Sequence, residues 1–156
     1  MKNSTKLSDT IHLLAAVQII REIAERRGLP LKGLLSSAAL AESIHTNPGY
    51  VRQLMMLARK AHLLLSERGK SNPSLARPAK DISLLDIYRT VAGEKSLLTL
   101  DAHINPECRV GVAIQHSLSD AYRKIQSSAE SEMAKISLQD IINGYYARTG
   151  GDALPD

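Results

Sequence analysis

Apolar residues recur at helical spacing over most of the chain, and the first such stretch covers residues 7–28. Its apolar positions follow one another by three or four residues, as on the buried face of a helix: Ile11, Leu14, Ala15, Ile19 and Ile23. Ser8 or Asp9 is suited to cap this helix and Gly28 to end it. Residues 29–35, with Pro30 and Gly33, are expected to form a loop.

Two shorter helices are predicted next, separated by a very short turn. Ser36 is a favoured cap for the first, whose buried residues would be Leu40, Ala41 and Ile44. Asn47 and Pro48 form a cap and first-position pair for the second, which is expected to continue to about His62. The second helix has two faces: Val51, Leu54, Met55 and Ala58 on the apolar one, and Arg52, Gln53, Met56 and Lys60 on the other. Helices joined so closely must cross steeply, as in a helix-turn-helix.

A hairpin, or wing, is expected after the second helix. Residues 64–66 and 74–76 are short strand candidates, and a polar, basic segment, residues 67–73, separates them. A helix over Leu84–Ala92 follows, with Ser83 and Asp86 placed as a capping box and Gly93 at its end. Residues 94–107 show no regular pattern.

A long helix is predicted over residues 110–135, because apolar residues recur there in steps of four and three. Ser137 then caps a last helix that ends near Tyr146, and residues 150–156 are expected to be disordered. The predicted fold is mainly α with a small β-hairpin wing. It comprises a winged helix-turn-helix domain at 7–93, a linker and dimerisation helix region at 94–148, and a flexible tail at 149–156.

The composition fits a small, helix-rich protein. The chain has neither Trp nor Phe, so its core must be built from aliphatic residues and Met, which favour helices over a large sheet. No apolar run approaches the roughly 20 residues that cross a bilayer, and residues 1–9 lack the apolar core of a secretion signal. With one cysteine, no internal disulfide can form. These features predict a cytoplasmic protein without membrane contact.

Charge is distributed unevenly along the chain. Residues 1–80 carry 13 Lys and Arg against 5 Asp and Glu, whereas residues 81–156 carry 7 against 11. A basic half joined to an acidic half suggests that the first half faces a polyanion such as double-stranded DNA. Ordinary surface charge is the alternative interpretation.

Several motifs, read together, resemble the Rrf2 family of bacterial transcription regulators. They are the stretch 37–44 (SAALAESI) with Asn47-Pro48 and Val51-Arg52, then Leu75-Ala76-Arg77-Pro78, the stretch 81–89 (DISLLDIYR) and Asn105-Pro106-Glu107-Cys108. The resemblance implies a dimeric winged helix-turn-helix regulator. Many members hold an iron–sulfur cluster on three cysteines, but this chain has only Cys108 there, so it resembles the cluster-free branch and no cofactor is expected. The glycine-rich wing tip of the family is reduced to Gly69-Lys70-Ser71-Asn72-Pro73.

The second helix of the motif is the expected recognition element, because its N-terminal end enters the major groove in this class of protein. Arg and Gln side chains can hydrogen-bond guanine and adenine edges, and wing cations suit the minor groove. The candidate DNA-binding residues are Ser37, Thr46, Asn47, Tyr50, Arg52, Gln53, Arg59, Lys60, Arg68 and Lys70. The alternative for the helix is an ordinary solvated polar face.

The long helix is the expected dimer interface, since its apolar stripe is too regular for solvent exposure. The candidate interface residues are Ile114, Leu118, Ala121, Tyr122 and Ile125. Folding back onto its own domain is the alternative. Cys108 lies just before this helix and next to Arg109, an electropositive setting that favours thiol reactivity. It is a candidate redox sensor, and an inert thiol is the alternative.

The sequence therefore predicts a sequence-specific DNA-binding regulator rather than an enzyme. It is expected to be a homodimeric repressor, and an activator is the alternative. No catalytic grouping, metal-ligand spacing or phosphate-binding loop is visible, and nothing indicates a particular small-molecule effector. A protein-interaction module that uses the winged-helix surface without specific DNA binding is the alternative function.

Overall fold

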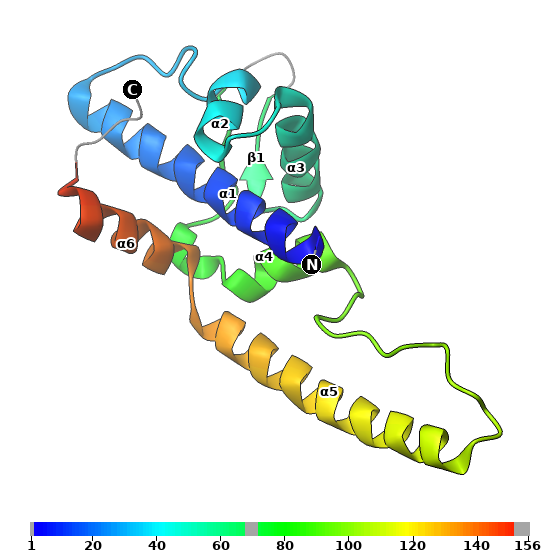
Figure 1. Cartoon of the computed structure of the whole chain (residues 1–156). Coiled ribbons are helices and arrows are strands. Elements are labelled where there is room, and N and C mark those ends of the chain that lie inside the picture. The colour runs from blue at the N-terminus through cyan, green and yellow to red at the C-terminus, as the bar shows by residue number, and fades with distance from the viewer. Residues whose placement is uncertain (1, 68–71, 152–156) are drawn as a thin grey trace.

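The computed structural model describes residues 2–67 and 72–151 of the chain. Their elements are α1 (Lys2–Arg27), α2 (Ser37–Ile44), α3 (Pro48–Lys60), β1 (Leu64–Leu65), β2 (Ser74–Leu75), the short 3-10 helix η1 (Ala79–Asp81), α4 (Leu84–Ala92), α5 (Arg109–Lys135) and α6 (Leu138–Thr149). Helices α1–α4 and α6 form one body, and α5 extends away from it (Figure 1). The predicted fold class, mainly helical with one small hairpin, is confirmed.

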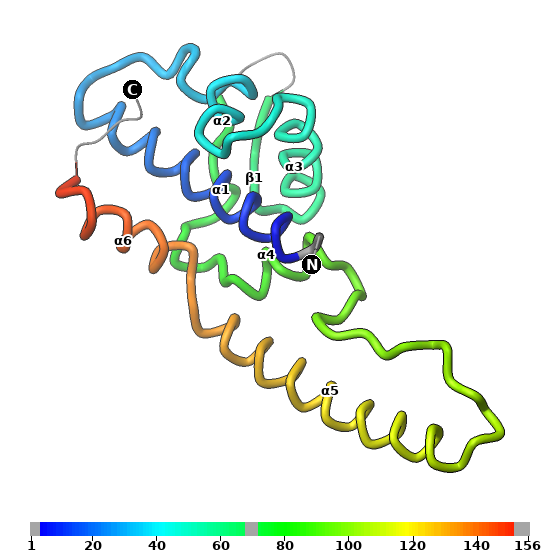
Figure 2. The backbone as a smooth tube through the Cα atoms, in the orientation of Figure 1, coloured from blue at the N-terminus to red at the C-terminus, as the bar shows by residue number. Residues whose placement is uncertain are grey.

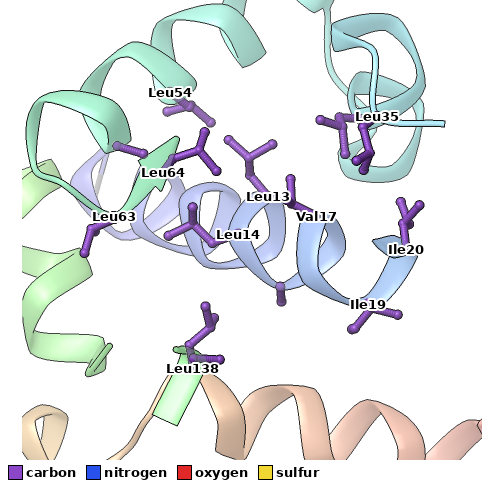
Figure 3. Close-up of a cluster of buried hydrophobic side chains, with 14 of the residues drawn as sticks. Leu13, Leu14, Val17, Ile19, Ile20, Leu35, Leu54, Leu63, Leu64 and Leu138 are labelled. Atoms are coloured by element: carbon purple, nitrogen blue, oxygen red, sulfur yellow. The ribbon is translucent and has the colours of Figure 1, made fainter. Parts of the chain in front are cut away.

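Helix α1 is the centre of the body. Apolar side chains lie on several of its sides, and Leu13, Leu14, Val17 and Ile23 are fully buried. In Figure 3, the labelled side chains of α1 point to different sides of the helix, with Leu13 on the side of α3 and Ile19 on another side. The elements packed on α1 include α2, α4, α6 and β2. A helix with core contacts on so many sides organises the rest of the domain.

Helix α1 begins earlier than the sequence predicts. Ser8 and Asp9 were expected to cap it, but it begins at Lys2 and both residues lie within it. The Ser8 hydroxyl donates to the Ser4 carbonyl at 3.1 Å, and the Thr10 hydroxyl donates to the Lys6 carbonyl at 2.7 Å. The hydroxyl groups of serine and threonine can thus be accommodated inside a helix, because they donate hydrogen bonds to backbone carbonyls of the preceding turn. The first helix therefore begins five residues before the predicted start at residue 7.

The predicted caps are otherwise confirmed. Side-chain oxygens of Ser36, Asn47, Ser83 and Ser137 each accept a backbone N–H three residues on. Helix α3 ends at Lys60 rather than His62, because His62 has a left-handed backbone (φ 59°) that a helix cannot contain. Each of these helices thus begins where its local sequence places a cap.

The wing is a minimal antiparallel hairpin. Leu64 pairs with Leu75 and Leu65 with Ser74, so both strands are shorter than predicted. On the side toward α1, the Arg21 guanidinium donates to the Pro73 carbonyl at 3.1 Å. The wing is therefore anchored to the central helix just before its second strand begins.

Arg77 and Asp86 tie the end of the wing to α4. The Arg77 guanidinium bonds the Asp86 carboxylate at 2.9 Å, and Asp86 also accepts the Ser83 backbone N–H. Burial alone would raise the pKa of Asp86, but hydrogen bonds from Ser83 and the charge of Arg77 hold that pKa below its ordinary value. The carboxylate form is therefore favoured by the folded state.

Asp86→Ala is expected to lower the free energy of unfolding by about 1 kcal/mol at neutral pH. The side chain is 37% exposed, so solvent screening keeps the effect modest. Because folding depresses this pKa, the contribution is fully present above the ordinary value of about 3.9 and is lost as the pH falls through the folded-state value. Denaturant unfolding of the parent protein and of the variant measures this effect. The difference between their free energies of unfolding should be present at pH 7 and should disappear in acid. Asp120→Asn, on exposed α5, is the control, and a difference that persists in acid would contradict the assignment.

Helix α6 returns to the body instead of belonging to a separate region. The Leu84 N–H donates to the Ile136 carbonyl and the Leu138 N–H to the Ile82 carbonyl, both at 2.8 Å. Leu138 and Ile142 are fully buried in the core around α1. Figure 2 shows the backbone turning after α5 to run beside α1. These two apolar side chains of α6 thus complete the core around α1, although the sequence groups α6 with the region of the dimerisation helix.

The end of α6 is also held on α1. The Tyr146 hydroxyl donates to Glu22 at 2.7 Å and the Arg26 guanidinium to the Gly151 carbonyl at 2.8 Å. Burial and the Glu22 carboxylate raise the pKa of Tyr146 to about 12, so it stays a donor. Thr149, predicted to open a flexible tail, is the last residue of α6; residues 152–156 lie outside the described residues. No helix in the described part of the chain is long and apolar enough to span a bilayer.

Candidate nucleic-acid interface

Helix α3 presents two contrasting faces. Val51, Leu54 and Ala58 are fully buried against the core. The opposite face is exposed and carries Arg52, Gln53, Met56, Arg59 and Lys60. Arg52, Arg59 and Lys60 form no hydrogen bond or ion pair with other described residues, so their charges are available to an external polyanion. The face has the shape and charge of a recognition helix.

The turn before α3 fixes the angle between α2 and α3. His45 ends α2 in a left-handed conformation (φ 64°), and the Thr46 N–H donates to the Ala41 carbonyl at 2.9 Å. Asn47 then caps α3, with its side-chain oxygen on the Tyr50 N–H at 2.9 Å. A turn this short, with its backbone groups paired, holds the two helices steeply crossed.

Tyr50 connects the start of α3 to α1. Its hydroxyl donates to the Asp9 carboxylate at 2.9 Å, across 41 residues of sequence. Burial, together with this hydrogen bond and the carboxylate charge, raises the pKa of Tyr50 to about 12. The hydroxyl is thus bonded inside the protein, where it helps to position the start of α3. The sequence, which predicts Tyr50 as a DNA-binding residue, does not reveal this role.

The structure brings four of the ten predicted DNA-binding residues together on one face of α3. Arg52, Gln53, Arg59 and Lys60 share the exposed face of α3. Ser37 and Thr46 are half-buried at the start of α2 and in the turn, and Asn47 is exposed although its side chain is used as a cap. Arg68 and Lys70 lie outside the described residues. Met56, 43% exposed at the centre of the face, adds an apolar contact surface that the site prediction omitted.

Two residues that support this surface were not found from the sequence. Asp9 holds Tyr50, and Arg21 holds Pro73 at the base of the wing. Both pairs join α1 to segments more than 40 positions away. No local pattern marks such a pair, so only the fold identifies them.

The apolar stripe on α5 is solvent-exposed. No residue of α5 is buried, and the exposed fractions are 68% for Val110, 54% for Ile114, 38% for Leu118 and 47% for Ile125. The stripe is therefore not covered by the domain's own body, which was the alternative interpretation. Ala121 is exposed with it. An apolar stripe of this regularity is typical of a protein contact surface.

Tyr122 lies apart from that stripe. It is half-buried and lines a cleft between α5, α4 and the segment before α5. In the same region Gln126 donates to the Tyr88 hydroxyl at 3.0 Å and accepts the Leu97 N–H at 2.9 Å. This side of α5 therefore contacts its own chain, and Tyr122 is the least suited of the predicted interface residues.

Cys108 is the cap of α5. Its Sγ accepts the Gly111 N–H at 3.5 Å, and the side chain is exposed. The thiol thus stands at the start of the long helix, where a change in its size or polarity acts directly on the helix end.

Residues 10–144 match the family model Rrf2, which is described as an iron-dependent transcriptional regulator. The candidate HTH-type transcriptional regulator YwnA of Bacillus subtilis (strain 168) is 33% identical over 140 residues, which cover 90% of this chain and 96% of YwnA. Among solved structures, a crystal structure of a candidate DNA-binding protein is 32% identical, with a TM-score of 0.66 over 88% of this chain and 98% of that one. CymR (YrzC), the global cysteine regulator of Bacillus subtilis, is 20% identical, with a TM-score of 0.59 over 92% and 97% of the two chains, and supports the fold alone.

The donor groups of this chain do not fit the iron in the description of the family model. Iron–sulfur clusters are held mainly by thiolates, and the chain has one cysteine. Among residues 2–67 and 72–151, no three His, Cys, Asp or Glu side chains are grouped so as to hold a metal ion.

Proposed function

This chain belongs to the Rrf2 family of transcriptional regulators, and we propose that it is a homodimeric repressor that binds a pseudo-palindromic operator in double-stranded DNA. The observation that carries the proposal is the exposed basic face of α3 in a helix-turn-helix, whose Arg52, Arg59 and Lys60 bond no other residue that the structure describes. Bound in the major groove, Arg52 and Gln53 near the start of α3 would contact base edges, and Arg59 and Lys60 would lie nearer the phosphates.

The rigidity of the motif supports this function. The core residues of α3, the Asn47 cap and the bond between Tyr50 and Asp9 fix the helix before DNA arrives. A preorganised helix loses little conformational freedom on binding, so more of the contact energy remains for affinity and selectivity.

Dimerisation through the exposed stripe of α5 completes the proposal. A twofold axis across Ile114, Leu118 and Ile125 would bury those side chains against their own copies. It would also present two α3 helices to one DNA duplex, and such dimers bind half-sites about 34 Å apart. Two linked contacts raise the affinity far above that of one.

Selection from a random DNA pool tests the proposal. The purified protein is expected to enrich a sequence with twofold symmetry and to bind it at least about 1,000-fold more tightly than random DNA. The affinity should fall steeply with salt, because bound cations displace counterions from the duplex. Equal binding to all sequences, or no binding, would instead favour a protein-interaction module.

We also propose that oxidation of Cys108 modulates DNA binding. With hydrogen peroxide, the thiolate sulfur attacks one oxygen and the O–O bond breaks, which gives a sulfenic acid and releases hydroxide. The hydroxide takes a proton from solvent and becomes water. The added polar oxygen replaces the sulfur as the cap of α5. Mild peroxide is expected to change operator affinity several-fold in the parent protein.

The control is Cys108→Ser, which keeps a good cap but cannot be oxidised. It should bind operator like the reduced parent and ignore peroxide. If parent and variant respond alike, the oxidised group is a methionine; if neither responds, Cys108 is an inert thiol.

A further inference from the structure

A groove of about 630 Å³ lies where α1, α2 and α6 meet, away from the exposed face of α3. In Figure 1, α1 runs between α2 and α6. The residues that line the groove are Ser8, Ile11, His12, Ala15, Ala16, Ile19, Ile20, Ser43, Ile141 and Tyr145. Its volume is within the usual range of small-molecule sites, about 300–1,000 Å³.

The sequence of α1 explains the hollow. The lining residues of α1 recur in steps of three and four, so they share one side of the helix. Ala15 and Ala16 occupy the middle of that side, with Ile11 before them and Ile19 after them. Short side chains flanked by long ones leave a depression that neighbouring helices do not fill.

The lining specifies the chemistry of an occupant. It contains no Asp, Glu, Lys or Arg, so no side chain would neutralise a full charge carried into the groove. His12 and Ser43 supply a polar pair, joined by a bond of 3.0 Å between Nε2 and Oγ. This pair bridges α1 and α2. A suitable ligand is therefore uncharged and mainly apolar, with one hydroxyl or carbonyl group for the polar pair.

We propose that this groove binds an uncharged, mainly apolar small molecule of that kind, and that its binding alters DNA affinity. The regulatory part rests on the proposed DNA-binding function. The groove contacts α2, the first helix of the helix-turn-helix, through Ser43, and contacts α6, which follows the dimer helix, through Ile141 and Tyr145. A ligand that engages His12 competes with its bond to Ser43 and so acts on the position of α2. A second copy of this chain is the alternative occupant.

The neutral fluorescent probe N-phenyl-1-naphthylamine tests the groove without DNA. Its emission rises in an apolar site, and titration is expected to saturate at one probe per chain. Ala16→Leu fills the hollow and should raise the dissociation constant at least tenfold. Ala147→Leu makes the same change at an exposed position of α6 outside the groove and should leave binding unchanged.

Ile141→Glu covers the case in which Ala16→Leu does not fold. Ile141 is 39% exposed, so the chain tolerates a polar residue there, and the carboxylate should repel an apolar probe from the groove. The proposal is overturned if the probe does not saturate, or if both alanine variants bind it equally. Two other results would show that a second copy of this chain occupies the groove and would also overturn the proposal. Either Ala16→Leu changes the oligomeric state, or only dissociated protein binds the probe.

The regulatory part has its own measurement. Saturating probe is expected to change the affinity of the parent for its selected DNA several-fold and to leave that of Ala16→Leu unchanged. If bound probe leaves the DNA affinity unchanged, the regulatory part of the proposal is overturned, and the proposal of a binding site stands. Absence of any DNA binding would refute the proposed function itself, and the regulatory part with it, although the probe result would stand.

Discussion

Leu118→Asp is expected to prevent formation of the proposed dimer and to leave the protein monomeric. Leu118 lies in the middle of the exposed stripe on α5, with Ile114 and Ile125 on either side. Burying a leucine is worth about 1.5–3 kcal/mol, and a twofold interface loses it twice. The aspartate adds the penalty of an unpaired buried charge. Together these terms raise the dissociation constant by more than about 100-fold.

Sedimentation across a range of protein concentrations measures this change. Ala113→Asp is the matched control, because Ala113 is exposed on α5 but lies five residues from Leu118, about 140° around the helix. It should remain dimeric. Circular dichroism of both variants should match the parent, since no residue of α5 belongs to the core. A Leu118→Asp protein that sediments as an unchanged dimer would place the interface elsewhere.

Loss of the dimer should also weaken operator binding. A monomer offers one α3 helix instead of two linked ones, and the gain from effective concentration disappears. The variant is therefore expected to bind a single half-site as the parent's isolated subunit would, with the same base preference. This result would separate the role of α5 in assembly from that of α3 in recognition.

Much of the local structure could be predicted from the sequence, because caps and helical periodicity involve residues only a few positions apart. Asn47 with Pro48, and Ser83 with Asp86, are examples that the structure confirms. The start of α1 could not be placed, because no residue before Ser8 prevents a helix. The stripe on α5 was also visible, since it repeats along one helix.

The parts of the site that depend on distant residues were missed. The bonds from Tyr50 to Asp9 and from Arg21 to Pro73 each join segments far apart in the sequence. The return of α6 depends on Leu138 and Ile142, whose spacing marks an apolar face but not the surface that the face covers. Sequence patterns show which side of an element is buried, and only the tertiary structure shows against what.

Arg52→Ala is expected to weaken binding to the selected operator by roughly 1–3 kcal/mol, or about 5- to 150-fold, if its guanidinium contacts a base. Arg52 is exposed in the first turns of α3 and forms no bond with other described residues. The variant therefore removes no internal contact, and its thermal stability should match that of the parent. Binding to random DNA should fall much less, because that binding depends on total charge.

Arg109→Ala separates base recognition from charge. It removes the same side chain from an exposed position on α5, distant from α3, so it changes the net charge equally. Operator and random DNA should both bind it nearly as they bind the parent. Competition between operator and random DNA at fixed salt directly measures the ratio of the two affinities. A fall in that ratio for Arg52→Ala alone assigns sequence selectivity to α3, because a purely electrostatic role would lower both affinities together and leave the ratio unchanged.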